Sequence, residues 1–301
     1  MSRNASHGTR FGGKPCVLCG QPSTRLGEHI LPRWFVEDCQ NEGPFTVEFG
    51  GIPCTSRGGA ILTLPSLANI HVPMCATCNN RLNTNLEEKA KPVVRRFTLG
   101  PESAPWPYLS AEECGALARW FLKVCLLSKH PDAQEDAPQL DENPVVQRLS
   151  FMDVQWLDWM RVGTNPPDSF SVYANRESTD PQTPVAEEAL MIFIPHVTVG
   201  TMDLHLQTWS IDLFGLLVTV VWHPGWPILH PLVATGRAFT LWPAPEPRDF
   251  ADLPELPRHE FEFCVGGMSM GFQNRAEFAR CAQDPLRTGD DLVGRIMRPR
   301  Q

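Results

Sequence analysis

The chain has 301 residues, of which 42% are hydrophobic and 20% are charged, a balance typical of a globular protein with a sizeable core. It contains no apolar run of about 20 residues, which excludes a transmembrane helix, and its N-terminus lacks the apolar segment of an export signal. We therefore expect a soluble, cytoplasmic protein with no membrane partner, whose ten cysteines are thiols or metal ligands and not disulfides.

The formal net charge of −8 is unevenly distributed along the chain. Residues 1–100 carry 11 Lys and Arg against 7 Asp and Glu, a balance of +4, whereas residues 101–301 carry 15 against 27, a balance of −12. A basic N-terminal third is compatible with phosphate binding in that part of the chain. The acidic remainder leaves a substrate other than nucleic acid open.

Two Cys-x-x-Cys pairs follow a Gly/Ser/Arg-rich segment, residues 1–13, that we expect to be a disordered tail. Cys16 pairs with Cys19, and Cys75 with Cys78. This is the spacing of zinc knuckles, and two knuckles supply the four sulfur ligands of a closed, structural Zn²⁺ site. A closed site has no open coordination position, so this zinc is expected to hold the fold and to take no part in chemistry.

The second cysteine pair leads into a predicted helix. Residues 79–94 have apolar side chains at spacings of three or four. Asn79 and Asn83 are then one turn apart on one face. The predicted order of elements over residues 14–92 is knuckle, strand, turn, strand, knuckle, helix.

The proline-rich stretch 100–107 predicts a boundary between a zinc-binding domain, residues 14–100, and a C-terminal domain of unknown role, residues 105–301. Ser110 and Glu113 form a capping box that opens an amphipathic helix through Leu127. A second helix is expected from residue 144, and short strands follow after residue 168. We predict an α+β fold, a zinc-stapled ββα module followed by a larger α+β body with an antiparallel sheet. The expected strands cover residues 170–173, 190–195, 204–211, 216–221, 238–242 and 261–265.

Between the two cysteine pairs stand Glu28-His29-Ile30-Leu31-Pro32 and Asn69, and Asn79-Asn80 follows Cys78. As a set, these motifs resemble the HNH (ββα-metal) endonuclease family over residues 14–92, under a third of the chain. The resemblance implies metal-dependent hydrolysis of phosphodiester bonds in nucleic acid, DNA more than RNA. It also implies that Glu28 and Asn79 hold the catalytic metal and that Asn69 holds the loop carrying the base.

His29 is the candidate general base, because a neutral imidazole near pH 7 accepts a proton from the attacking water. Asn83, one turn from Asn79, is a candidate third ligand. Carboxylate and amide oxygens favour Mg²⁺ or Mn²⁺ as the catalytic ion. Both helix positions are Asn where the family more often has His, so we expect a loosely held ion that keeps several waters.

Two alternatives stay open. One is a metalloenzyme of the same fold that acts on a small molecule in a pocket covered by the C-terminal domain, where tryptophans neighbour the His-Pro pairs at His223 and His230. The other is a zinc-stapled binding protein without turnover. An open basic cleft at His29 favours nucleic acid as partner, and a covered pocket favours a small-molecule substrate.

Overall fold

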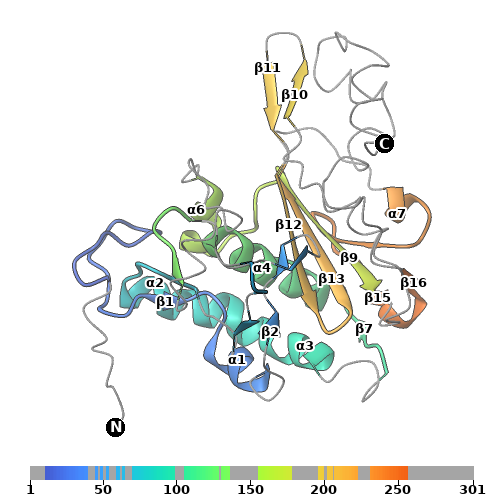
Figure 1. Cartoon of the computed structure of the whole chain (residues 1–301), viewed down its shortest axis with the longest axis horizontal. Helices are drawn as coiled ribbons and strands as arrows, with labels where there is room; N and C mark the ends of the chain where they lie inside the picture. The colour runs from blue at the N-terminus through green and yellow to red at the C-terminus, as the bar shows by residue number, and fades with distance from the viewer. Residues whose placement is uncertain are drawn as a thin grey trace. The chain divides into compact units, whose positions relative to one another are not determined.

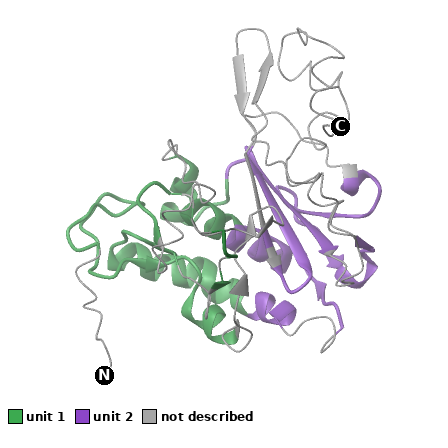
Figure 2. Ribbon diagram, in the orientation of Figure 1, with its two compact units in different colours: residues 1–49, 53–91, 122–166 green, residues 50–52, 92–121, 167–301 purple. Residues whose placement is uncertain are grey.

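The computed structural model describes residues 11–39, 45–46, 48–49, 52–53, 59–61, 63–64, 70–98, 105–128, 130–135, 155–177, 196–199, 202–205, 207–222 and 231–256. The chain divides into two compact units, drawn in green and purple in Figure 2. Unit 1 comprises residues 1–49, 53–91 and 122–166, and unit 2 comprises residues 50–52, 92–121 and 167–301. Each unit is assembled from segments far apart in the chain. The division into domains 14–100 and 105–301 stays a prediction.

A small antiparallel sheet organises unit 1, with β6 (Ile70–Val72) between β1 (Glu28–His29) and β8 (Gln134–Glu135). Residues 1–10 of the predicted tail lie outside the described residues, but Phe11 is fully buried and its N–H donates to the carbonyl of Arg25. The other short elements in this part of the chain are α1 (Arg33–Cys39), β2 (Phe45–Thr46), β3 (Glu48–Phe49), β4 (Ile52–Pro53), β5 (Thr63–Leu64) and α6 (Gln155–Val162).

The predicted helix after the second cysteine pair is present and is interrupted by one wider turn. It runs through α2 (Ala76–Leu82), a π-helical turn at Asn83–Glu87, and α3 (Glu88–Thr98). Cys75 caps its N-terminus, since the Cys75 Sγ accepts from the N–H of Cys78 at 3.5 Å. The buried positions Leu82, Leu86 and Ala90 follow the apolar spacing that predicted the helix.

Unit 2 is built on an antiparallel sheet in the order β12 (Gln207–Leu213), β13 (Leu216–Trp222), β9 (Phe170–Glu177), β14 (Phe239–Trp242). Figure 1 labels the first three of these strands. The β12–β13 hairpin turns at Phe214 and Gly215, both with positive φ, which matches the right-handed twist of paired strands. The smaller elements of unit 2 are β7 (Tyr108–Leu109), β10 (His196–Val199), β11 (Met202–His205), α7 (Pro231–Ala234), β15 (Arg248–Asp249), a 3₁₀ turn (Phe250–Asp252) and β16 (Glu255–Leu256).

The α+β class with an antiparallel sheet is therefore confirmed. Of the predicted strands, those beginning at residues 170, 216 and 238 match β9, β13 and β14, and the stretch 204–211 is divided between β11 and β12. The stretches 190–195 and 261–265 lie outside the described residues. β13 is buried from Leu216 to Val221 because both faces of this central strand are covered. No helix in the described ranges has the length and apolarity needed to cross a membrane.

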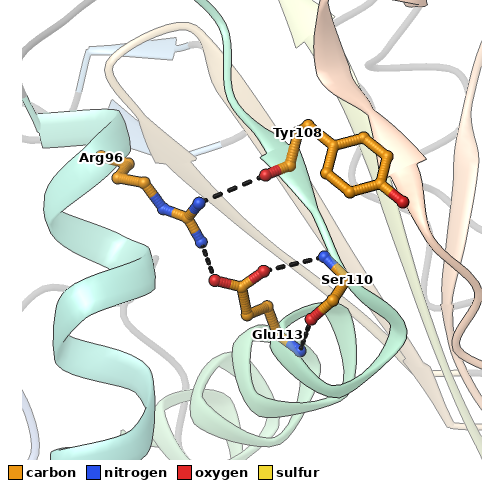
Figure 3. A network of polar contacts seen from close by, with 4 residues as sticks. All are labelled: Arg96, Tyr108, Ser110 and Glu113. Carbon is orange, nitrogen blue, oxygen red and sulfur yellow. Dashed lines mark hydrogen bonds and ion pairs between the residues drawn. The ribbon is translucent and has the colours of Figure 1, made fainter.

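The capping box predicted at Ser110 is present at the start of α4 (Ala111–Ser128) (Figure 3). The Ser110 N–H donates to Glu113 Oε2 at 2.8 Å, and the Glu113 N–H donates to Ser110 Oγ at 3.3 Å. The same carboxylate accepts from Arg96. Arg96 also donates to the carbonyl of Tyr108 at 3.2 Å. These contacts fix the first turn of α4 against the end of α3 within unit 2.

Candidate functional site

The four predicted zinc ligands lie together in unit 1. The Sγ atoms of Cys16, Cys19, Cys75 and Cys78 are all within 4.8 Å of one another. The Sγ atoms of Cys19 and Cys75 are 3.6 Å apart. Four sulfurs at the usual Zn–S distance of about 2.3 Å in a tetrahedron stand about 3.8 Å from each other. The cluster therefore has the donor set and the spacing to hold one metal ion.

Backbone hydrogen bonds bring the two cysteine pairs together across more than 50 residues. The N–H of Val17 donates to the carbonyl of Pro73, and the N–H of Thr24 donates to the carbonyl of Met74. Within the first knuckle, the N–H of Gly20 donates to the carbonyl of Cys16 with Gly20 at φ +73°. That backbone conformation favours glycine, so the turn itself presents the two thiols on one side.

The thiols differ in acidity. Burial raises the pKa of Cys16 and, with the neighbouring sulfurs, raises the pKa of Cys78. Burial also acts to raise the pKa of Cys75, but hydrogen bonds from the Cys78 N–H and from the neighbouring thiols outweigh it and lower this pKa to about 7. Cys75 is therefore the first of these three to become a thiolate, which is the form that binds metal.

The strand β1 carries Glu28 and His29 on opposite faces. It pairs antiparallel with β6, Glu28 opposite Val72 and His29 opposite His71. The pairing continues one residue further, because the N–H of Ile30 donates to the carbonyl of Ile70 at 2.8 Å. Side chains alternate across a strand, so the carboxylate and the imidazole leave β1 in different directions.

The Glu28 carboxyl meets the start of the helix that follows the second knuckle. The Asn79 side chain forms a hydrogen bond with it. Burial raises the pKa of Glu28, and the nearby Glu87 carboxylate adds to the rise, while the Lys123 ammonium and the Asn79 hydrogen bond act in the opposite direction. The Lys123 ammonium is paired with Glu87, at 2.7 Å, and its effect on the Glu28 pKa is smaller than that of burial. A cation bound at Glu28 would favour the ionised carboxylate.

His29 packs against His71, a residue that the motif did not single out. The two ring centroids are 4.1 Å apart with the planes tilted by 53°. His71 is buried, 7% exposed, whereas His29 is half-buried. In the sequence, His71 stands two residues after the motif residue Asn69, and this was the available hint that it matters. The sequence does not show that His71 lies opposite His29, because that depends on the register of β1 and β6.

The third candidate ligand, Asn83, has a different side-chain partner. Asn83 is exposed, its N–H donates to the carbonyl of Asn79, and its side-chain Nδ2 donates to Glu88 at 3.2 Å. Asn69 lies outside the described residues. The structure therefore brings Glu28 and Asn79 into contact and directs the amide of Asn83 to α3.

Several basic side chains that qualify as phosphate contacts are engaged within the protein. Arg96 pairs with Glu113, Arg33 pairs with Glu37 at 2.6 Å, and Arg81 donates to the carbonyl of Arg161. The Lys91 ammonium lies 5.7 Å from the ring centroid of Trp34. Lys89 is exposed on α3. Phosphate contacts are made by exposed basic side chains of this kind.

Comparisons with known proteins do not place this chain. No protein-family model matches it, no curated protein matches it, and no solved structure matches it. The resemblance to HNH endonucleases therefore rests on the motif residues between and after the cysteine pairs.

Proposed function

We propose that this protein is a metal-dependent endonuclease of the HNH type that hydrolyses phosphodiester bonds in nucleic acid, DNA in preference to RNA. The observation that carries the proposal is the contact between Glu28 and Asn79. These two motif residues are 51 positions apart in the sequence, and both belong to the unit that holds the cysteine cluster.

The cysteine cluster would hold a structural Zn²⁺. Its four thiols fit that ion by number, type and spacing. They leave no coordination position for water or substrate, so the role of the site is to fix both knuckles. The second knuckle caps α2, the helix that carries Asn79. The residues before this knuckle form β6, which pairs with the strand of Glu28 and His29.

Glu28 and Asn79 would hold a second, divalent ion. A carboxylate and an amide oxygen are hard ligands that suit Mg²⁺ or Mn²⁺. The raised pKa of the Glu28 carboxyl fits such an ion, because a cation relieves the unfavourable burial of the carboxylate. When bound, a divalent ion offsets negative charge on the scissile phosphate and on the leaving oxygen.

The residues of the chain supply the rest of the reaction. His29 accepts the proton of the attacking water, and its neutral imidazole is available near pH 7. The His71 ring restricts the rotation of the His29 ring from one side. Lys89 is an exposed cation of unit 1 that could contact a phosphate beside the scissile bond.

The test is His29→Ala with plasmid DNA, single-stranded DNA and RNA as substrates, each with Mg²⁺ and with Mn²⁺. Loss of a general base typically costs about 10²–10⁴ in rate. We expect that loss in kcat, with zinc content and melting temperature unchanged. His130→Asn is the matched control, since Asn keeps an acceptor for the Asp132 N–H at a histidine remote in sequence.

Full activity of His29→Ala on the substrate that the wild-type protein cleaves would contradict the mechanism. Cleavage of none of the three nucleic acids by wild-type protein with wild-type zinc content would contradict the substrate class. The small-molecule alternative would then take its place.

A further inference from the structure

Lys123 is a buried lysine that the proposed mechanism does not use. It lies in the middle of α4, among Phe121, Leu122, Val124 and Cys125, and its side chain is 0% exposed. Its Nζ donates to the carbonyl of Ile30 at 2.7 Å and to Glu87 Oε1 at 2.7 Å. The Glu87 side chain is 4% exposed. All three residues belong to unit 1.

A buried pair of this kind is a poor device for stability. Removing an ammonium and a carboxylate from water is unfavourable for each ion, and well-packed apolar residues often serve the fold equally well. An apolar side chain at residue 123 would continue the pattern of its neighbours in α4. The charge is therefore better explained by what it contacts.

Both partners of Lys123 adjoin the candidate active site. Ile30 directly follows His29, and its peptide is held on two sides: its N–H donates to Ile70 on β6, and its carbonyl accepts from Lys123. Glu87 ends the π-helical turn that joins α2, the helix of Asn79, to α3. The Lys123 ammonium also acts electrostatically on the Glu28 carboxyl.

We propose that Lys123 is a positioning residue of the active site: by bridging the Ile30 carbonyl and the Glu87 carboxylate, it fixes β1 against the helix that carries Asn79. The proposal rests on the function proposed above and deepens it. Without Lys123 the segment of Glu28 and His29 loses a fixed point directly after His29. The site then depends on a residue of α4, which lies outside the 14–92 segment that resembles HNH endonucleases.

The experiment compares wild-type protein with the double variant Lys123→Met/Glu87→Gln. This variant removes both charges and keeps similar side-chain volumes, so it leaves no lone buried charge. Loss of a residue that orients metal ligands typically costs 10–100-fold in metal affinity or activity. We expect kcat to fall by about 10–100-fold, with the substrate KM, the zinc content and the melting temperature near wild type.

A second readout does not require turnover. Mn²⁺ binding, followed by electron paramagnetic resonance on zinc-loaded protein, should weaken by a similar factor in the double variant. Glu28→Gln provides the reference for a missing ligand. Arg176→Met/Glu255→Gln is the matched control, because it removes an ion pair of 2.6 Å in unit 2 and should leave kcat and Mn²⁺ binding unchanged.

Wild-type kcat and wild-type Mn²⁺ affinity in the folded double variant would overturn the proposal. Loss of zinc or of the folded state in that variant would overturn it too, because the pair would then serve the fold as a whole. Failure of the proposed function has a different signature: wild-type protein cleaves no nucleic acid, and Glu28→Gln binds Mn²⁺ as wild type does. In that case the proposed function is wrong, and the positioning role proposed for Lys123 is wrong as well.

Discussion

Gly27, the residue directly before Glu28, determines how closely β1 approaches β6. Its φ is +70°, and a Cβ at this position would lie 2.3 Å from the Val72 carbonyl oxygen and 2.6 Å from Cδ2 of Phe11. The first of these atoms is backbone and cannot move without shifting β6. A glycine is therefore required for the pairing that sets Glu28 opposite Val72.

Gly27→Ala should destabilise the protein more than Gly13→Ala does. A non-glycine residue in the left-handed region costs on the order of 1–3 kcal/mol, and both variants incur this strain. Gly13 has φ +83°, and no atom of the described residues lies within 4 Å of its added Cβ, so only Gly27→Ala adds a clash. The free energies of unfolding from urea titrations measure the difference. Equal losses in the two variants would show that the contact with Val72 is relieved at no cost.

The grouping of the four cysteines was predictable from sequence, and the partners of β1, the strand of the candidate catalytic residues, were not. Two Cys-x-x-Cys pairs specify one tetrahedral site by chemistry alone, wherever the chain between them runs. Lys123 offered a signal, a charge within the apolar centre of a predicted helix. Its contacts, however, lie 36 and 93 residues away, at Glu87 and Ile30. Such pairings depend on the packing of whole elements, which no local pattern encodes.

At the scale of elements, the capping box of α4 makes stability depend on pH. The Ser110 N–H lowers the pKa of Glu113, burial opposes this, and the Ser110 hydroxyl and the Arg96 guanidinium lower it further. Because the folded-state pKa lies below its ordinary value of 4.5, the ionised carboxylate is favoured by folding. The stabilisation is complete above about pH 4.5 and is lost as the pH falls through the folded-state pKa.

Glu113→Gln should therefore be less stable than wild type at pH 7, by no more than about 1 kcal/mol for so exposed a pair. The two proteins should converge in stability as the pH is lowered below 4.5. At low pH Glu113 of the wild-type protein is protonated, so its side chain, like Gln, carries no charge that favours folding. Thermal melts from pH 7 to pH 3 measure this. Glu112→Gln is the control, since Glu112 is the exposed neighbour. A difference that stays constant over this range would contradict the assignment.

The helix after the second knuckle shows what periodicity predicts and what it misses. The apolar spacing of Leu82, Leu86 and Ala90 predicts a helix from residue 79 onward, and the helix is there. The π-helical turn at Asn83–Glu87 has no such signature, because one wider turn changes the hydrogen-bond register without changing the composition. The turn lies after Asn83, whose N–H still donates to the carbonyl of Asn79, so these two residues stay one helical turn apart. They differ in their side-chain partners, Glu28 for Asn79 and Glu88 for Asn83.

At the scale of the whole molecule, the two units do not follow the order of the chain. Residues 105–107 of the predicted boundary lie outside helices and strands, and residues 122–166 return to the unit of the cysteine cluster. A domain boundary predicted from composition marks the place where the chain becomes polar or proline-rich. A compact unit is defined instead by which segments pack together, and composition does not report that. The helix α4 supplies residues to both units, so a change of unit can fall inside an uninterrupted helix.

Removal of zinc should act unequally on the two units. Structural zinc in small modules contributes on the order of 10 kcal/mol at neutral pH, more than a sheet of two- and three-residue strands supplies. We expect a chelator to increase hydrogen exchange at β1, β6 and α2, while the amides of β9 and β13 stay protected in a sheet with its own buried core. Cys78→Ser should reproduce the pattern, and Cys114→Ser, a buried thiol outside the cluster, should not. If β9 and β13 lose protection together with β1, the chain folds as one cooperative body that zinc supports throughout.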